Sequence, residues 1–300
     1  MSNSGFVLLD KIAGETSFKA LFPLKRVFST KRVGHAGTLD LRASGLIIAA
    51  TGRCTRLLPF VEAKDKCYSF RLHLGYETDT LEWDGEVVEQ GEAKSISREE
   101  VERVLPQFTG DIEQIPPKYC AVKINGVRAS DLMERGRNIE LKPRRIHISE
   151  LKVIGEGEVT EGCSGKEFAT FDLICECSKG TYIRALGRDI GRALGTYACV
   201  SQIRRHRIGN VTVDKAVRGD ALTRENLLPV DAVLDFPVVR LTPEQVAVIR
   251  QGNWLPWKEK IEGVGPEGHV FAANMQGEVL ALCFYEPGRI KPKFYLGEDE

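Results

Sequence analysis

Residues 168–195 read FATFDLICECSKGTYIRALGRDIGRALG and contain the patterns of a strand, a turn and a helix in direct succession. Apolar residues first alternate with polar ones, which is the period of a strand with one buried face. After Ser178-Lys-Gly180, apolar residues recur at helical spacing and Gly195 ends the helix. The helical positions are Ile183, Leu186, Ile190 and Leu194. This segment therefore predicts a strand that turns directly into an amphipathic helix.

The residues before this segment contain strand patterns and helix patterns that do not alternate regularly. Strand patterns lie at residues 5–9, 46–50 and 67–75, and a capping box of Ser97 with Glu100 opens a helix. Another helix is predicted with Thr16 or Ser17 as its cap, and Pro23 is expected to kink it or delay its start. Strands and helices without regular βαβ alternation indicate an α+β fold.

A short strand-rich module is predicted at the C-terminus, beyond a boundary near residues 235–239. A helix starts at Thr242 and ends at Gly252. Strand patterns at residues 269–273 and 279–285 then flank a turn at 274–277. We therefore expect a large domain at residues 1–238 and a small barrel-like domain at residues 239–300.

Composition limits the class of protein. The chain has 300 residues, of which 42% are apolar, which suffices for a sizeable core. No apolar run approaches the roughly 20 residues of a membrane span, and the N-terminus lacks the pattern of a secretion signal, so we expect a cytoplasmic protein. The eight cysteines include no C-x-x-C pair, so we expect buried, reduced thiols and no zinc site.

Charged residues are segregated although the net charge is zero. Basic clusters comprise Lys25, Arg26, Lys31 and Arg32, then Lys142, Arg144, Arg145 and His147, then Arg204, Arg205, His206 and Arg207. Acidic residues gather between Glu82 and Glu102 and at the end of the chain, Glu298-Asp299-Glu300. The basic clusters are either a nucleic-acid-binding face or ordinary solvated surface charge, and charge alone favours neither.

The segment Gly34-His-Ala-Gly-Thr-Leu-Asp40 is the first candidate for a functional site. Its two glycines permit a tight loop and a close approach of the backbone to a ligand. Asp40 is either a catalytic carboxylate or a brace that hydrogen-bonds within the loop.

Two further segments carry aromatic and basic side chains. Tyr182 and Arg184 lie two positions apart, so both face one site only near a helix start. Arg184 either holds a catalytic Asp ionised or forms a structural salt bridge. Tyr68 lies on the apolar face of its strand, where it is either a core residue or a ring that stacks on a nucleobase.

These three segments, in this order, resemble the TruB family of pseudouridine synthases. The family pattern G-H-x-G-x-L-D-P-x-A-x-G is matched at Gly34, His35, Gly37, Leu39, Asp40, Ala43 and Gly45. The pattern K-x-Y, with a later G-x-x-T-D-T-x-D-x-x-G, is similar to Lys66, Tyr68, Gly75, Thr78, Asp79, Thr80 and Gly85. The pattern C-S-K-G-T-Y-I-R is intact at residues 177–184. The resemblance runs from about residue 5 to about residue 239 and continues faintly into the tail.

The resemblance implies an α+β pseudouridine synthase fold. This fold has a central mixed, mainly antiparallel sheet flanked by helices, an RNA-gripping insert at residues 115–150 and a small β-rich PUA-like domain at the C-terminus. The implied reaction is isomerisation of uridine to pseudouridine at position 55, in the TΨC arm of tRNA, with the base flipped out. It requires no metal and no redox cofactor. The implied partner is the TΨC stem-loop of tRNA, bound by a monomer that needs no protein partner and no membrane.

The same resemblance implies roles for individual residues. Asp40, Tyr68 and Arg184 are the expected catalytic residues, with Arg184 paired to Asp40. The expected substrate contacts are His35, Tyr182, Ile203, Arg204 and Arg205. We expect the carboxyl group of Asp40 to be buried within reach of the ribose of the flipped nucleotide.

The chain departs from the family pattern at Leu41 and Cys120, where the family has proline and serine, and at Ser130, where it has tyrosine. The alternatives are a guide-dependent ribosomal RNA enzyme of the dyskerin type, a non-catalytic RNA-binding or RNA-folding protein, and a glycosidase. The last lacks a second carboxylate by motif.

Overall fold

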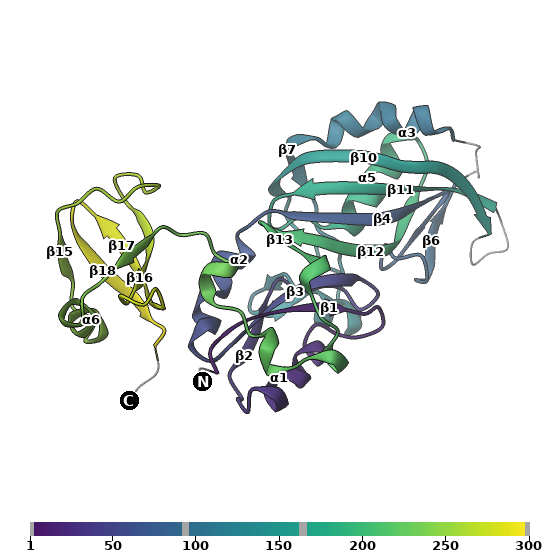
Figure 1. Ribbon diagram of the computed structural model, residues 1–300. Coiled ribbons are helices and arrows are strands. Elements are labelled where there is room, and N and C mark those ends of the chain that lie inside the picture. The colour runs from purple at the N-terminus through teal and green to yellow at the C-terminus, as the bar shows by residue number, and fades with distance from the viewer. Residues whose placement is uncertain (1–2, 92–95, 162–166, 298–300) are drawn as a thin grey trace.

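The computed structural model describes residues 3–91, 96–161 and 167–297. Figure 1 shows a large body of sheet and helices and a smaller β-rich unit at the C-terminal end. Cys163 and the acidic residues Glu298, Asp299 and Glu300 lie outside the described residues.

The body is built on one large sheet with the strand order β1-β3-β12-β4-β11-β10-β7. In addition, β2 pairs with β3, and β13 pairs with β12. The strands are β1 (Gly5–Lys11), β2 (Val33–Ala36), β3 (Ser44–Thr51), β4 (Lys66–Leu74), β7 (Gly110–Gln114), β10 (Arg144–Glu161), β11 (Glu167–Cys177), β12 (Ala198–Ile208) and β13 (Val211–Thr212). The contact between β3 and β12 is parallel, and the other pairs are antiparallel. This confirms the expected mixed, mainly antiparallel sheet.

The central helix α5 (Ile183–Ala193) follows β11 after the predicted glycine turn and packs on β12. Its glycines allow this close packing: a Cβ on Gly187 would lie 2.3 Å from Val200, and one on Gly191 would lie 2.5 Å from the Cβ of Ala198. The predicted period places Ile183, Leu186 and Ile190 in the core.

Other predicted helix starts are also confirmed. Ser97 and Glu100 form the capping box of α3 (Arg98–Val104). Pro23 lies in the first turn of α1 (Phe22–Val27), which therefore begins later than Thr16, after a single 3-10 turn. The remaining α-helices are α2 (Leu58–Glu62), α4 (Ala129–Glu134) and α6 (Pro243–Arg250). Short 3-10 helices lie at Lys19–Leu21, Gly52–Leu57, Leu105–Phe108, Val213–Lys215, Gly219–Ala221, Arg224–Asn226 and Val230–Ala232.

Two small hairpins project from the body. One consists of β5 (Tyr76–Thr78) and β6 (Val87–Gln90), and the other of β8 (Lys123–Ile124) and β9 (Val127–Arg128), with α4 following directly. The second hairpin and α4 belong to the insert expected at residues 115–150. The last residues of that range, from Arg144 on, form part of β10 in the central sheet.

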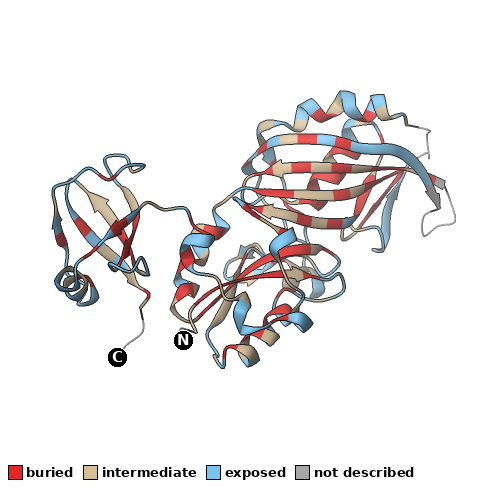
Figure 2. Cartoon of the chain, in the orientation of Figure 1, coloured by how far each residue is buried: buried red, intermediate tan, exposed pale blue. Residues whose placement is uncertain are grey.

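The C-terminal unit is a five-stranded sheet with the order β14-β16-β17-β18-β15. Its strands are β14 (Val238–Arg240), β15 (Leu255–Trp257), β16 (Gly268–Ala273), β17 (Val279–Glu286) and β18 (Gly288–Tyr295). Val238 already pairs with Phe271, so this sheet begins one residue before the expected boundary. Phe271, Leu282 and Leu296 share a buried cluster with residues of the body, which joins the two units. Figure 2 shows buried residues along the strands of both units.

Within the described residues, no helix is long and apolar enough to cross a membrane. The same part of the chain holds no group of three or more His, Cys, Asp or Glu residues that could bind a metal ion. The described cysteines are all buried and reduced, namely Cys54, Cys67, Cys120, Cys175, Cys177, Cys199 and Cys283.

Candidate active site

Asp40 lies in a tight turn between β2 and β3, next to the parallel contact of β3 with β12. The first half of the predicted glycine loop is strand β2, and the turn begins at Gly37, which has a φ of 74°. Gly45 has a φ of 102°, and a Cβ there would lie 2.3 Å from the backbone oxygen of Arg205. Glycine is therefore required at residue 45 both by its backbone angle and by the approach of β12.

Three buried side chains hold the backbone on either side of Asp40. The hydroxyl of Ser17 donates to the carbonyl of Leu39 (3.0 Å) and accepts from its N–H (2.9 Å). The Nζ of Lys11 donates to the carbonyls of Leu41 (3.3 Å) and Ala43 (2.5 Å). Arg205 donates from Nη2 to the carbonyl of Gly37 at 3.1 Å. The turn is thus held from its buried side, because each of these carbonyls accepts a hydrogen bond from a buried side chain.

Asp40 and Arg184 form an ion pair, as the resemblance predicts, and the structure shows that the contact is bidentate. The Nε of Arg184 lies 2.8 Å from one carboxylate oxygen, and its Nη2 lies 3.0 Å from the other. The same guanidinium donates to the carbonyls of Thr80 (2.8 Å) and Tyr119 (2.9 Å). It therefore ties together three segments that are distant in sequence, and its planar shape sets the orientation of the carboxylate.

The two members of this pair differ in burial. The side chain of Arg184 is 5% exposed, whereas that of Asp40 is 42% exposed. The expectation of a buried carboxyl group at Asp40 is therefore wrong: the carboxylate is anchored from the protein side and open on the other. This geometry presents a fixed negative charge to a ligand that arrives from solvent.

Both predicted site tyrosines remain neutral near pH 7. Burial raises the pKa of Tyr182 to about 12. Burial also raises the pKa of Tyr68, although the nearby Arg205 opposes this effect. The backbone of Tyr182 is clamped by the buried amide of Gln114, which accepts from its N–H (2.8 Å) and donates to its carbonyl (3.2 Å). Tyr68 lies on β4 directly opposite Arg205 on β12.

His35 and Ile203 differ in how far they are buried and in what surrounds them. His35 lies half-buried on β2, and its Nε2 is buried without a hydrogen-bond partner in the described part of the chain. Burial and the charge of Arg205 both lower the pKa of His35, so the ring is neutral. Ile203 is buried and forms part of the wall of a cavity of about 230 Å³, which Arg42 and Glu82 also line.

The basic cluster at residues 204–207 does not present free cations. Arg204 forms a bidentate pair with Asp10, at 3.0 and 2.9 Å, and Arg207 pairs with Glu176 at 2.6 Å. Arg205 is only 1% exposed and also donates from Nε to the carbonyl of Leu46 at 2.7 Å. A buried guanidinium cannot reach an RNA phosphate, so we reassign Arg205 from RNA contact to support of the Asp40 turn.

This assignment predicts different effects at two adjacent arginines. Arg205→Met removes a buried cation from two carbonyls, and we expect it to lower the free energy of unfolding by about 3 kcal/mol. Arg204→Gln breaks a half-exposed pair and should change that free energy by no more than about 1 kcal/mol. Urea denaturation of both variants measures the difference. Equal effects would show that Arg205 has no special structural role.

Sequence reasoning missed several residues of this site. Lys11 and Gln114 belong to no recognisable local pattern, Glu82 belongs to an acidic stretch, and Ser17 is a candidate helix cap. Burial lowers the pKa of Lys11, and burial raises the pKa of the Glu82 carboxyl despite the opposing charge of Arg184. Only the contacts across the fold reveal that Lys11, Ser17 and Glu82 lie near the Asp40 turn and that Gln114 holds Tyr182.

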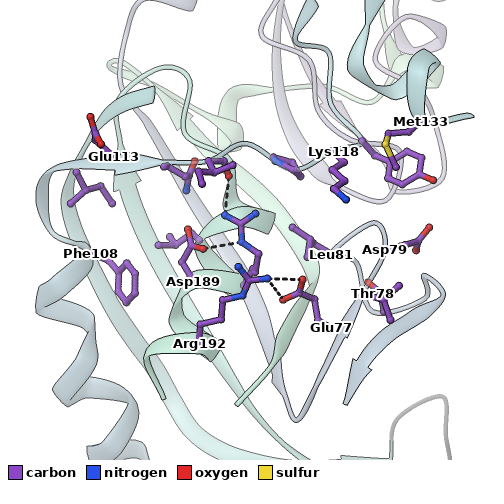
Figure 3. Close-up of a pocket in the computed structure, with 18 of the residues that line it drawn as sticks. Glu77, Thr78, Asp79, Leu81, Phe108, Glu113, Lys118, Met133, Asp189 and Arg192 are labelled. Carbon is purple, nitrogen blue, oxygen red and sulfur yellow. Dashed lines mark hydrogen bonds and ion pairs between the residues drawn. The ribbon is translucent and has the colours of Figure 1, made fainter. Parts of the chain in front are cut away.

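A cavity of about 750 Å³, drawn in Figure 3, lies next to this site and does not include Asp40. It is lined by α5, the strand β5 and the start of the insert. Leu81 and Tyr119 border it, but Asp40 does not. Both arginines that line it are paired, since Arg192 binds Glu77 at 3.0 and 3.1 Å and Arg188 binds Asp189 at 2.8 Å.

The fold has counterparts among solved structures. The chain aligns with a protein in an H/ACA RNP bound to a substrate RNA containing 2'-deoxyuridine, with a TM-score of 0.71 and 19% identity, over 99% of this chain and 86% of that one. It aligns with a protein of a Cbf5–Nop10–Gar1 complex with a TM-score of 0.67 and 22% identity, over 99% and 84% of the two chains. At these identities the likeness shows a shared fold, an α+β body on a mixed sheet with a small β-rich C-terminal unit.

Sequence comparison identifies the class and the family of the chain. Residues 25–183 match the model of the TruB family pseudouridylate synthase (N terminal domain). The chain is 36% identical to tRNA pseudouridine synthase B of Caulobacter sp. (strain K31), covering 96% of this chain and 94% of that protein. It is 38% identical to the protein of the same name from Bradyrhizobium diazoefficiens, covering 96% and 84%. The chain therefore belongs to the TruB family of pseudouridylate synthases and is an isomerase.

Proposed function

We propose that this enzyme converts the uridine at position 55, in the TΨC arm of tRNA, to pseudouridine. The family and the names of its relatives support tRNA as the substrate. The observation that carries the proposal is the Asp40–Arg184 pair, in which a fixed carboxylate faces solvent on one side.

The reaction breaks the glycosidic bond from N1 of uracil to C1′ of the ribose, rotates the detached base and joins its C5 to C1′. C5 then releases its hydrogen as a proton and N1 gains one, so the product is an isomer of the substrate. In our proposal Asp40 acts at the ribose, either as a nucleophile at C1′ or as the base that removes a sugar proton. Both routes need an ionised carboxylate in a defined orientation. Arg184 supplies this orientation through its bidentate contact and its two backbone anchors.

The remaining residues of the proposed site hold the flipped base. Tyr68 and Tyr182, both neutral, offer rings against which uracil can pack, and Ile203 provides an apolar wall. His35 is proposed to fill the space that the flipped nucleotides leave in the RNA loop. Flipping the nucleotide out of its stack costs a few kcal/mol, and contacts between the protein and the rest of the RNA offset this cost.

The organisation of the chain fits this proposal. Residues 1–238 would carry the catalysis, and residues 239–300 would add a PUA-like RNA-binding surface. The insert that begins at residue 115 is proposed to grip the RNA. We expect a cytoplasmic monomer that acts without a guide RNA or a protein partner.

Mapping of pseudouridine tests the proposal directly. An unmodified tRNA transcript is incubated with the protein alone, and pseudouridine is located by mass spectrometry after chemical derivatisation. We expect one new pseudouridine, at position 55, and none in a transcript whose uridine 55 is replaced by cytidine. Modification at a different site, or only when a guide RNA is added, would refute the proposed substrate.

A further inference from the structure

The segment that precedes Asp40 is unusually basic and also aromatic. Residues 16–39 contain five basic residues and no acid. The basic residues are Lys19, Lys25, Arg26, Lys31 and Arg32. Within the described chain none of them forms an ion pair, in contrast to the neutralised arginines of β12. This segment therefore carries uncompensated positive charge at the surface.

Two phenylalanines of this segment lie in solvent. Phe18 is 60% exposed and Phe22 is 50% exposed, and neither belongs to a buried cluster. Their ring centroids are 5.5 Å apart with an interplanar angle of 83°. The Nζ of Lys25 lies over both rings, 5.0 Å from one centroid and 5.2 Å from the other. Exposed aromatic rings of this kind mark a contact surface because water solvates them poorly.

This pair borders the proposed active site. Ser17, the neighbour of Phe18, holds both backbone groups of Leu39, the residue before Asp40. Two more exposed apolar residues, Ile12 and Leu41, lie close to Asp40, since the N–H of Gly14 donates to the carbonyl of Leu41 at 2.8 Å. Figure 1 places α1 beside β2, the strand that leads to the turn, and Figure 2 shows exposed residues along this helix.

We propose that Phe18 and Phe22 stack on an unpaired nucleobase of the RNA substrate outside the catalytic pocket, while the five cations bind the phosphates on either side. The proposal rests on the proposed function, since it assigns a contact of the same RNA. Single-stranded nucleic acid is bound in general by aromatic rings set among cations, because every base has a stacking face and every linkage a negative charge. A second copy of the chain fits poorly, because a two-fold contact here would bring the two sets of five cations together.

The test compares three double variants that alter the rings in graded ways. Phe18→Ala with Phe22→Ala removes the side chains, Phe18→Leu with Phe22→Leu keeps apolar bulk without a ring, and Phe18→Tyr with Phe22→Tyr keeps the rings. We expect the alanine and leucine variants to raise the Kd for a tRNA transcript about tenfold and the tyrosine variant to leave it unchanged. The turnover rate at saturating tRNA should stay as in the parent, because the stacked base is not the reacting one.

Val159→Ala, which truncates an exposed apolar residue of β10, is the control and should bind as the parent does. Unchanged Kd values in all three double variants would overturn the proposal, even if the parent enzyme modifies uridine 55 normally. Loss of binding with alanine but not with leucine would also overturn it, because that result indicates an apolar contact without stacking. A parent enzyme that is dimeric in light scattering, with a monomeric alanine variant, would assign the surface to self-association instead.

Discussion

Asp40→Asn is expected to abolish pseudouridine formation while leaving the affinity for tRNA within about tenfold of the parent. The amide has nearly the shape of the carboxylate and can still accept one hydrogen bond from Arg184. The amide is, however, neither a nucleophile nor a base, so no group remains to carry out the proposed step at the ribose. Single-turnover modification of a TΨC stem-loop, measured beside equilibrium binding, separates the two effects.

The large sheet contains a matched control for the Asp40→Asn variant. Asp172 on β11 also forms a bidentate pair with an arginine, Arg71, with both distances at 2.8 Å. Its side chain is 39% exposed, close to the value for Asp40. Asp172→Asn should therefore reproduce any general effect of breaking such a pair and retain turnover. Substantial turnover by Asp40→Asn, or an equal loss in both variants, would refute the role of Asp40.

Arg184→Lys is expected to lower the single-turnover rate at least about 100-fold, with a smaller change in the affinity for tRNA. Lysine keeps the charge, but its ammonium group cannot bind both carboxylate oxygens and the carbonyls of Thr80 and Tyr119 at once. The carboxylate then loses its fixed orientation, and a displacement of about 1 Å suffices for a rate loss of about this size.

The folded state must be monitored in this experiment because Arg184 is buried. Arg71→Lys, at the half-exposed pair of β4, is the control for the general cost of replacing arginine by lysine. The thermal midpoint of each variant shows whether the fold persists at the assay temperature. A folded Arg184→Lys enzyme with an unchanged rate would remove Arg184 from the proposed mechanism.

Much of the fold could be predicted from local pattern. The strand that ends at Cys177 and the helix that begins at Ile183 follow from hydrophobic periods of two and 3.6 residues, which any short segment reveals. The caps of α3 and α6 are equally local. The turn at Asp40 could be predicted only in part. Its glycines indicate a tight loop, but glycine is required at residue 45 by the close approach of the β12 backbone, which is far away in sequence.

The candidate site was recognised from motif resemblance and not from chemistry alone. Each of Asp40, Tyr68 and Arg184 has an ordinary structural interpretation when it is considered by itself. Their functional interpretation depends on their proximity in the fold. Asp40 and Arg184, which form the central ion pair, are 144 positions apart in the sequence. No local period encodes a contact over that distance, so the residues alone could not establish it.

The sequence by itself determined the strand and helix on either side of the turn at residues 178–180, the caps of α3 and α6, and the presence of a glycine loop before Asp40. These properties depend on backbone sterics and on the burial of one face, which act over a few residues. The tertiary structure alone decided which charges are available to a ligand. Arg204 and Arg205 are neighbours of the same type, yet one pairs with Asp10 across 194 positions and the other is buried beneath the Asp40 turn. A charge is exposed, paired or buried according to what the whole fold packs against it, because electrostatic and burial energies depend on distance in space and not along the chain.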